Sequence, residues 1–245
     1  MATFRPDPMR FLTGADAETS RPKAISDPGQ GGKFTPNGEV LPFPGNTVLC
    51  HIDPASDVHA ALCDMQDEIR QSDFGALFTY LPSASLHMTV FQGIAPDERN
   101  WPADIPVEAT RDEVTAAFRQ RLDGQDLPAI RRVCARGLYG GHSLTLEGAD
   151  AIEEARLRAT RVSLRELTGL RQDHFDTYTF HVTLAYLLRW LDVAEAADLL
   201  SFSDELFARY ADRLAVIELG PLELCTFEHM HHFEPVAYLT RAASS

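Results

Sequence analysis

The feature that most constrains this chain is a five-residue pattern that occurs twice. Residues 86–90 and 180–184 both read apolar, histidine, apolar, threonine, apolar. In a β-strand successive side chains point to opposite faces of the sheet, so His87 and Thr89 share one face, as do His181 and Thr183. Each segment is therefore expected to bury an apolar face and to present an imidazole and a hydroxyl together on the other.

The periodicity of the remaining sequence predicts further strands and four long helices. Strands are expected at 47–52, 77–81, 86–91, 132–139, 143–147, 179–188, 216–219, 222–227 and 236–239, and helices at 56–72, 110–124, 150–168 and 192–214. Ser56 is a candidate N-cap of the first helix, either Thr110 or Asp112 starts the second, and Gly169 stops the third. Strands on both sides of helices, with a hairpin across Gly140-Gly141, favour an α+β fold with antiparallel pairing over a doubly wound parallel sheet.

The N-terminal segment differs from the rest of the chain. Residues 1–45 lack sustained periodicity and are rich in proline and glycine. Such residues are typical of irregular structure, because they interrupt both helices and strands. We interpret 1–45 as an irregular N-terminal arm and 46–245 as a single domain.

Charge and composition narrow the classes of partner. The chain has 245 residues and a formal net charge of -14. An acidic surface repels a nucleic-acid backbone, which argues against duplex DNA but not against a small phosphorylated ligand. The apolar runs are too short to span a bilayer, and the first residues lack the apolar core of a secretory signal. The four cysteines have no C-x-x-C spacing and are expected to be reduced, so we predict a cytoplasmic protein without a membrane partner.

The two histidines suit the chemistry of phosphodiester hydrolysis. Imidazole titrates near neutral pH, so His87 and His181 can serve as base and acid, in either order. Thr89 and Thr183 can donate hydrogen bonds to the non-bridging oxygens of a phosphate. This scheme requires neither a metal nor a cofactor, and none is expected.

These motifs resemble the signature of the two-histidine (2H) phosphoesterase superfamily, which includes cyclic phosphodiesterases and proteins named as RNA 2′,5′-ligases. The signature is a pair of His-hydrophobic-Thr/Ser-hydrophobic motifs, matched here by residues 87–90 and 181–184, and the resemblance covers about residues 46–240. It implies a bilobal α+β fold of two pseudo-symmetric antiparallel sheets with outer helices and a central cleft. It also implies hydrolysis of a small cyclic phosphate, such as a nucleoside 2′,3′-cyclic phosphate, or of a related 2′,5′-type ester. The implied partner is a small phosphorylated nucleotide or a short RNA end.

Strand alternation and loop position suggest further residues that line the substrate site. Phe91 has the same parity as His87 and could stack on a base or ribose. Tyr178 precedes the second motif and could reach the mouth of the cleft. Tyr186 has the opposite parity from His181 and is expected to be packed inside.

The sequence indicates less clearly which cationic side chain would neutralise the phosphate. Lys33 follows Gly31-Gly32 in what resembles a phosphate-cradling turn, although the full P-loop pattern is missing. Lys33 is therefore the candidate lysine for the substrate site. The alternatives are three arginines of a predicted strand region: Arg131, Arg132 and Arg136.

Two other functions are compatible with the same sequence. One is a non-catalytic module that binds a nucleotide in the same cleft. The other is a metal-dependent hydrolase centred on His229, His231 and His232, whose spacing could place two imidazoles on one side of a strand. His51, on a predicted strand, is interpreted as a structural histidine with a hydrogen-bond partner.

Overall fold

A computed structural model describes residues 7–96, 101–128, 130, 132–173 and 175–240. The α-helices are α1 (Pro8–Thr13), α2 (Asp57–Gln71), α3 (Arg111–Leu122), α4 (Ala151–Thr168) and α5 (Val193–Tyr210), and the 3-10 turns are η1 (Gly75–Leu77), η2 (Ser83–Ser85) and η3 (Phe175–Thr177). The strands are β1 (Gly45–His51), β2 (Phe78–Tyr80), β3 (His87–Gln92), β4 (Arg132–Tyr139), β5 (Ser143–Gly148), β6 (Phe180–Thr183), β7 (Ala185–Leu187), β8 (Ile217–Glu218), β9 (Glu223–His229) and β10 (His232–Tyr238).

The strands form two antiparallel sheets, which confirms the predicted α+β class. The larger sheet has eight strands in the order β10-β9-β1-β3-β6-β5-β4-β8, and β2 pairs with β7 in a separate ribbon. The eight-stranded sheet divides into two groups of four, β10-β9-β1-β3 and β6-β5-β4-β8. Each group contributes one His-x-Thr strand, and the groups join where Met88 of β3 pairs with Val182 of β6. The pseudo-symmetric lobes expected from the sequence are therefore continuous in one sheet.

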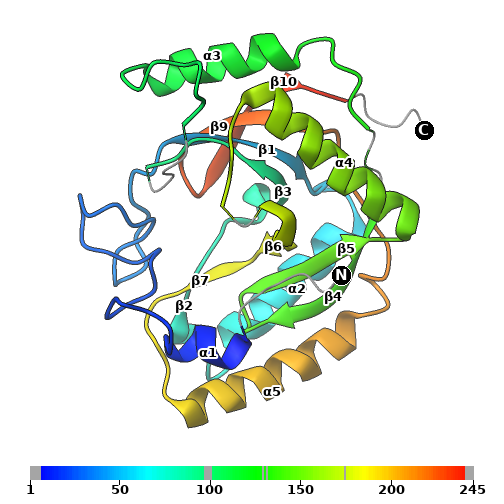
Figure 1. The fold of residues 1–245 in the computed structure, drawn as a ribbon. Helices are drawn as coiled ribbons and strands as arrows, with labels where there is room; N and C mark the ends of the chain where they lie inside the picture. The colour runs from blue at the N-terminus through cyan, green and yellow to red at the C-terminus, as the bar shows by residue number, and fades with distance from the viewer. Residues whose placement is uncertain (1–6, 97–100, 129, 131, 174, 241–245) are drawn as a thin grey trace.

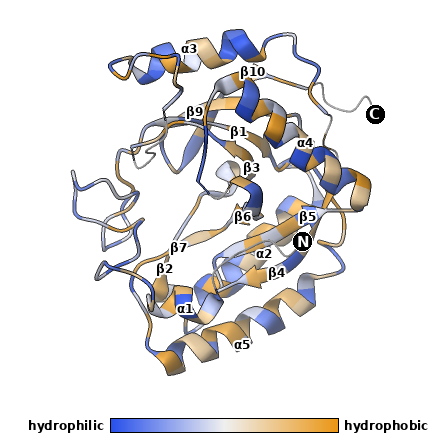
Figure 2. Ribbon diagram, viewed as in Figure 1, coloured by the Kyte–Doolittle hydropathy of each residue, from blue (hydrophilic) through white to orange (hydrophobic). Residues whose placement is uncertain are grey.

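The helices cover the sheet from several sides (Figure 1). Helix α4 packs on β3, β4 and β5 and also contacts α3, whereas α5 packs on β4, α1 and α2. Figure 2 shows that the helices carry both hydrophilic and hydrophobic residues, whereas the central strands are largely hydrophobic. This distribution is expected where each helix buries one stripe and exposes the other. Among the described residues, no helix is long and apolar enough to cross a membrane.

The predicted ends are confirmed by caps in α2, α3 and α4, whereas α5 ends at Tyr210 and not at 214. The Ser56 hydroxyl accepts from the backbone N–H of His59 at the start of α2 (3.1 Å). Thr110 and Glu113 form a reciprocal capping box at the start of α3. Gly169 ends α4 with a left-handed backbone conformation (φ 73°), which glycine adopts without a Cβ clash.

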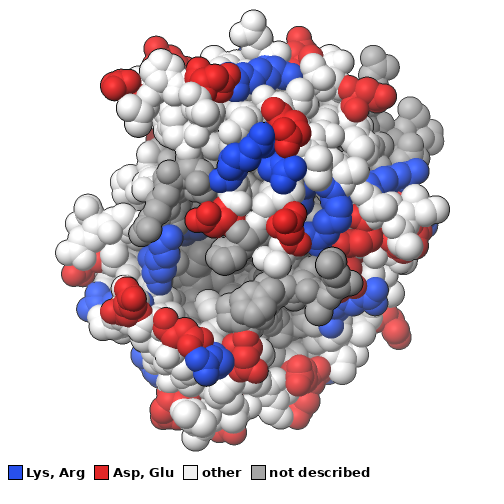
Figure 3. Space-filling view, in the orientation of Figure 1, with Lys and Arg blue, Asp and Glu red and all other residues white. Residues whose placement is uncertain are grey.

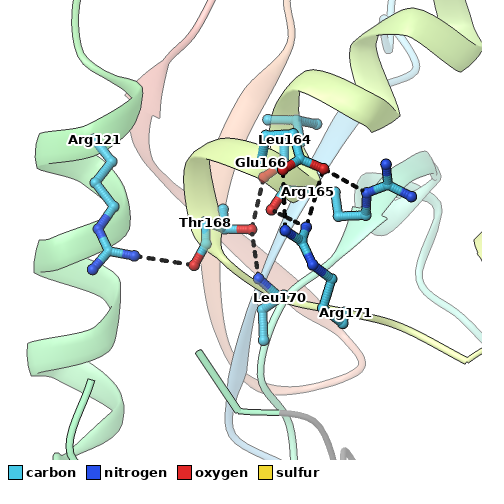
Figure 4. Close-up of polar contacts among 7 residues, drawn as sticks. All are labelled: Arg121, Leu164, Arg165, Glu166, Thr168, Leu170 and Arg171. Carbon is cyan, nitrogen blue, oxygen red and sulfur yellow. Dashed lines mark hydrogen bonds and ion pairs between the residues drawn. The ribbon is translucent and has the colours of Figure 1, made fainter. Parts of the chain in front are cut away.

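Polar contacts tie the end of α4 to its neighbours (Figure 4). Arg121 of α3 donates to the carbonyl of Thr168 (3.1 Å), and Arg171, beyond the helix, pairs with Glu166 (3.0 Å). The Thr168 hydroxyl donates to the carbonyl of Leu164 (2.7 Å). These contacts fix the beginning of the loop that leads from α4 to β6.

The strand predicted at 179–188 is wrong in one respect, because it divides into β6 and β7. At Leu184 the chain leaves the large sheet, since the backbone N–H groups of Leu184 and Ala185 both donate to the carbonyl of His142 (2.8 and 3.2 Å). The Leu184 carbonyl then accepts from the backbone of Leu81 and from the side chain of Gln66. β7 consequently pairs with β2 rather than continuing beside β5.

The N-terminal segment packs closely on the rest of the protein. Helix α1 buries Leu12 in the main core. Phe34 and Phe43 join Leu49 and Phe227 in a second, smaller hydrophobic core. The backbone N–H of Phe43 also donates to the carbonyl of Glu228 on β9 (2.8 Å). The described part of the arm thus forms one wall of the molecule beside the β9–β10 hairpin.

Candidate active site

The two His-x-Thr motifs lie side by side on neighbouring strands. Met88 pairs with Val182 in an antiparallel ladder, so the next residue on each side places His87 opposite Thr183 and Thr89 opposite His181. Met88 and Val182 are buried, whereas the histidines and threonines are only partly buried. The alternation expected for the two motifs is confirmed, and the four polar side chains share one face of the sheet.

Each histidine is held by the same hydrogen bond. His87 Nδ1 lies 2.6 Å from the carbonyl oxygen of Ser85, and His181 Nδ1 lies 2.8 Å from that of Thr179. A carbonyl oxygen can only accept, so Nδ1 carries the hydrogen in both rings. In the neutral form of each ring, the lone pair that can take a proton is therefore on Nε2.

A cavity of about 470 Å³ brings these side chains together. Both histidines and both threonines line it, with Lys23 and Lys33 of the arm. Aromatic side chains form much of the remaining wall: Phe43, Tyr178, Tyr186, Phe227 and Phe233. A smaller pocket of about 260 Å³ shares His181 and Thr183 and extends toward the β4–β5 hairpin. The arrangement matches a ligand site with a polar centre and apolar sides.

The environment of His87 disfavours its protonated form. Burial lowers the pKa of His87 to about 4, and positive charge on His51, His181 and Lys33 acts in the same direction. The hydrogen bond to the Ser85 carbonyl opposes this effect but does not overcome it. His87 is therefore neutral at pH 7 and can accept a proton at Nε2.

Lys33 lies in the wall that the two pockets share. Its Nζ is 5.0 Å from the centroid of the Phe43 ring and 5.5 Å from that of Tyr186, and it lines both pockets. No carboxylate of the described residues forms an ion pair with it. Lys23 and Lys33 are the only lysines of the chain, and both line the larger cavity. Lys33 lies at the substrate site, as expected. Lys23 was not predicted to line the site, although the occurrence of both lysines in the arm indicated that it could.

Tyr178 also lies where the sequence predicts. Its hydroxyl donates to the carbonyl of Thr89 (3.3 Å), and its ring centroid is 6.1 Å from that of His181. On the other side the guanidinium of buried Arg161 stacks over the Tyr178 ring at 4.0 Å. Arg161 donates to the carbonyl of Val90 as well, so it links the loop before β6 to β3.

The expectation that Phe91 lines the cleft is wrong. Val48 pairs with Phe91 and Leu49 with Thr89, so Val90 is an extra residue of β3 in a β-bulge. The bulge reverses the alternation and turns Phe91 into the core, where its ring lies 6.5 Å from that of Phe175. Gln92 lines the cavity in its place.

The expectation that Tyr186 packs inside is also wrong. Tyr186 lines both pockets and is only partly buried. Counting alternate residues from His181 fails here, because the strand breaks at Leu184 and β7 belongs to the other sheet.

The alternative arginines lie elsewhere. Arg132 pairs with Asp150 (3.5 Å) and Arg136 with Glu147 (2.9 Å), and neither lines the two pockets that contain the histidines. Arg131 lies outside the described residues.

The histidine-rich segment at 229–232 does not gather three metal ligands. His232 pairs with Glu234 (2.9 Å), and His229 Nδ1 accepts from the backbone N–H of His231. Within the described ranges, the group of three potential ligands is instead His51, Glu223 and Cys225. His51 Nδ1 lies 2.7 Å from Glu223 Oε2, so His51 has the hydrogen-bond partner expected of it.

Comparisons with known proteins agree with the geometry. Residues 33–135, which include the first motif, match the family model described as 2H-phosphodiest, a domain of unknown function (DUF1868). The crystal structure of a conserved protein of unknown function from Agrobacterium tumefaciens is similar, with a TM-score of 0.86 and 28% identity over 96% of this chain and 100% of that chain. No curated protein matches the chain. The chain is therefore similar to the 2H-phosphodiest family over residues 33–135, and its whole fold is similar to that of the Agrobacterium tumefaciens protein.

Proposed function

We propose that this protein is a metal-independent phosphodiesterase that hydrolyses a small cyclic phosphate, such as a nucleoside 2′,3′-cyclic phosphate, or a related 2′,5′-type ester. The observation that carries the proposal is the antiparallel pairing of the two His-x-Thr motifs. It gives each histidine a threonine of the other motif as its neighbour, at the centre of one cavity. A phosphate bound over these four side chains can accept hydrogen bonds from the two hydroxyls and lies beside the two imidazoles.

In this proposal His87 is the general base. It is neutral at pH 7, and Nε2 takes the proton of the attacking water as the water oxygen bonds to phosphorus. His181 is the general acid, which protonates the ester oxygen as its bond to phosphorus breaks. Each of these proton transfers typically contributes about 10²- to 10⁴-fold to the rate.

Neutral hydrogen-bond donors and one positive group stabilise the negative charge that builds on the phosphate. Thr89 and Thr183 donate hydrogen bonds to the non-bridging oxygens, where they are most effective in the transition state. Lys33 supplies the positive charge, and no described acidic side chain competes for it. Its contacts with the rings of Phe43 and Tyr186 hold it in the wall of the site.

The size and charge of the protein favour a small substrate. A volume of about 470 Å³ lies within the range of sites for single small ligands, and the aromatic wall can stack on a nucleobase. Acidic and basic side chains are interspersed on the face shown in Figure 3, and the net charge is -14. A nucleotide or a short RNA end suits this surface better than a duplex. The free cysteines support a reducing compartment such as the cytoplasm.

The proposal is tested by incubating the protein with the four nucleoside 2′,3′-cyclic phosphates in EDTA and separating the 2′- and 3′-monophosphates. We expect turnover that EDTA does not change, and the isomer formed identifies the bond that is cut. Nucleotide binding by calorimetry without turnover would contradict an enzyme and favour the binding-module alternative. Activity that EDTA removes and a metal restores would contradict the metal-independent mechanism.

A further inference from the structure

Three side chains that can bind a metal ion come together outside the substrate site. They belong to two neighbouring strands of the large sheet, with His51 on β1 and Glu223 and Cys225 on β9. His51 Nδ1 lies 2.7 Å from Glu223 Oε2, and the sulfur of Cys225 lies 3.7 Å from the same oxygen. One potential ligand atom of each residue lies within 4.8 Å of the other two. The three groups are therefore close enough to bind one ion together.

The spacing of these atoms is compatible with a tetrahedral zinc ion. Zinc binds nitrogen and oxygen at about 2.0–2.2 Å and thiolate sulfur at about 2.3 Å, which separates two tetrahedral ligands by roughly 3.3–3.7 Å. The sulfur–oxygen distance of 3.7 Å agrees with this range. The nitrogen–oxygen distance of 2.7 Å is that of a hydrogen bond, and it would lengthen by less than about 1 Å when an ion replaces the shared hydrogen.

The carboxylate of Glu223 has no permanent cation beside it. Its side chain is 6% exposed. Among the residues that the structure describes, its ion-pair partner is His51, and no arginine or lysine lies within ion-pair distance. Buried charged groups are in general paired with an opposite charge or bound to a metal. A divalent ion between the three side chains would supply a positive charge that does not depend on the protonation of a neighbour.

The donor set indicates the class of ion. A thiolate and an imidazole favour zinc and similar transition metals, whereas magnesium and calcium prefer oxygen ligands. Cys225 is a free cysteine, so its sulfur is available, and binding would release the thiol proton to solvent. Three protein ligands leave a fourth tetrahedral position for water. The His51 side chain is 24% exposed, which gives the ion a route from solvent.

We propose that His51, Glu223 and Cys225 form a binding site for one zinc ion, separate from the substrate site. None of the three lines either pocket that contains His87 and His181. The inference goes beyond the proposed function and does not rest on it, because the hydrolysis assigned to the two motifs uses none of these ligands.

Cobalt(II) tests the site directly, because a bond between cobalt and a thiolate gives a charge-transfer absorption band in the near-ultraviolet. The reduced, metal-free protein is titrated with Co²⁺. We expect this band to saturate at one cobalt per chain. Added Zn²⁺, whose filled d shell gives no such band, should remove it by taking the same ligands.

Two variants identify the ligands. Cys225→Ser replaces the thiol by a hydroxyl and should lose the charge-transfer band. Glu223→Gln keeps the shape of the side chain and removes the anionic ligand, so calorimetry with Zn²⁺ should show weaker binding than in the wild type. Circular dichroism shows whether each variant is folded, and Glu223→Gln decides the matter if Cys225→Ser is not.

Cys63→Ser is the matched control. Cys63 Sγ lies 3.7 Å from His59 Nδ1 on α2, so this pair also joins a thiol to an imidazole. Within the described ranges, however, neither residue belongs to a group of three potential ligands. Cys63→Ser should therefore keep the wild-type band and stoichiometry. His232→Gln is the equivalent control for the histidine-rich segment and should keep them as well.

The absence of a thiolate band in the wild type would overturn the inference, as would a band that persists in Cys225→Ser. Loss of the band in Cys63→Ser or His232→Gln, with Cys225→Ser unchanged, would also overturn it. Unchanged affinity for Zn²⁺ in Glu223→Gln would have the same meaning. The proposed function is tested separately, by turnover in EDTA. Turnover without cobalt binding would contradict only the zinc site, and cobalt binding without turnover would contradict only the proposed function.

Discussion

At the scale of single residues, the site depends on one local hydrogen bond that is used twice. In both motifs Nδ1 of the histidine donates to the carbonyl two residues earlier in the chain. This contact fixes the tautomer and limits rotation of the ring, so that Nε2 is the nitrogen available for proton transfer. Because the bond is local, each motif brings its own orienting group wherever its strand is placed.

The two threonines should contribute to the rate through their hydroxyl groups. Thr89→Val and Thr183→Val keep the size and branching of the side chain and remove one hydrogen-bond donor each. We expect kcat to decrease by about 10-fold or more in each variant, since loss of one donor to a developing oxyanion costs up to about 10³-fold. Steady-state kinetics on a cyclic phosphate measures this effect.

Thr226→Val is the matched control, because Thr226 is a partly buried threonine of β9 that does not line the cavity. Its kcat should equal that of the wild type. A loss as large as that of Thr89→Val would show that the effect comes from the sheet and not from the phosphate.

The sequence predicts the four central residues but not all of their neighbours. Alternation along a strand is a local rule, and it places His87, Thr89, His181 and Thr183 correctly on one face. It fails as soon as the strand is interrupted. Phe91 follows a bulge and Tyr186 follows a strand break, and neither interruption has a local signal such as glycine or proline.

At the scale of elements, both interruptions arise from contacts with other parts of the chain. The bulge in β3 is defined by its pairing with β1, which is distant in the sequence. The break after β6 is set by the carbonyl of His142, which lies in the turn between β4 and β5. The capped ends of α2, α3 and α4 were predicted more accurately, because their capping residues lie within a few residues of the helix.

The bulge leads to opposite expectations for two adjacent residues. Phe91→Ala should lower the free energy of unfolding by about 3–5 kcal/mol, because it leaves a cavity in the core. Its KM should change little. Gln92→Ala should raise KM and change stability by less than about 0.5 kcal/mol, since Gln92 is exposed and lines the site.

Denaturant unfolding measures the stability of both variants, and steady-state kinetics measures their KM. A stable Phe91→Ala protein with a strongly raised KM would show that the simple alternation holds and that the bulge is absent.

At the scale of the whole molecule, the arm and the sheet build the site together. The sheet supplies the histidines and threonines, while the arm supplies Lys23, Lys33 and Phe43. The second hydrophobic core joins Phe34 of the arm to Phe227 of β9. The sequence could not predict this packing, because proline- and glycine-rich segments carry no periodicity that identifies a buried face.

The lowered pKa of His87 should make the protein less stable in acid. The pKa of His87 is about 4 in the folded protein, compared with 6.5 as its ordinary value, so the unfolded chain binds the extra proton first. The stability that His87 contributes is therefore present above pH 6.5 and is lost as the pH falls from 6.5 toward 4.

Urea unfolding at a series of pH values measures this effect. His87→Gln cannot titrate, and its stability should decrease less steeply than that of the wild type between these pH values. Parallel curves for the two proteins would contradict the depressed pKa of His87.

The central claim is that His87 and His181 together carry out the hydrolysis. It is tested most directly by kcat/KM for the best cyclic phosphate in the wild type, His87→Ala and His181→Ala. Each variant should fold and should lose about 10²- to 10⁴-fold in kcat/KM, because each removes one proton transfer. A folded variant of either histidine that stays within a few-fold of the wild type would contradict the account.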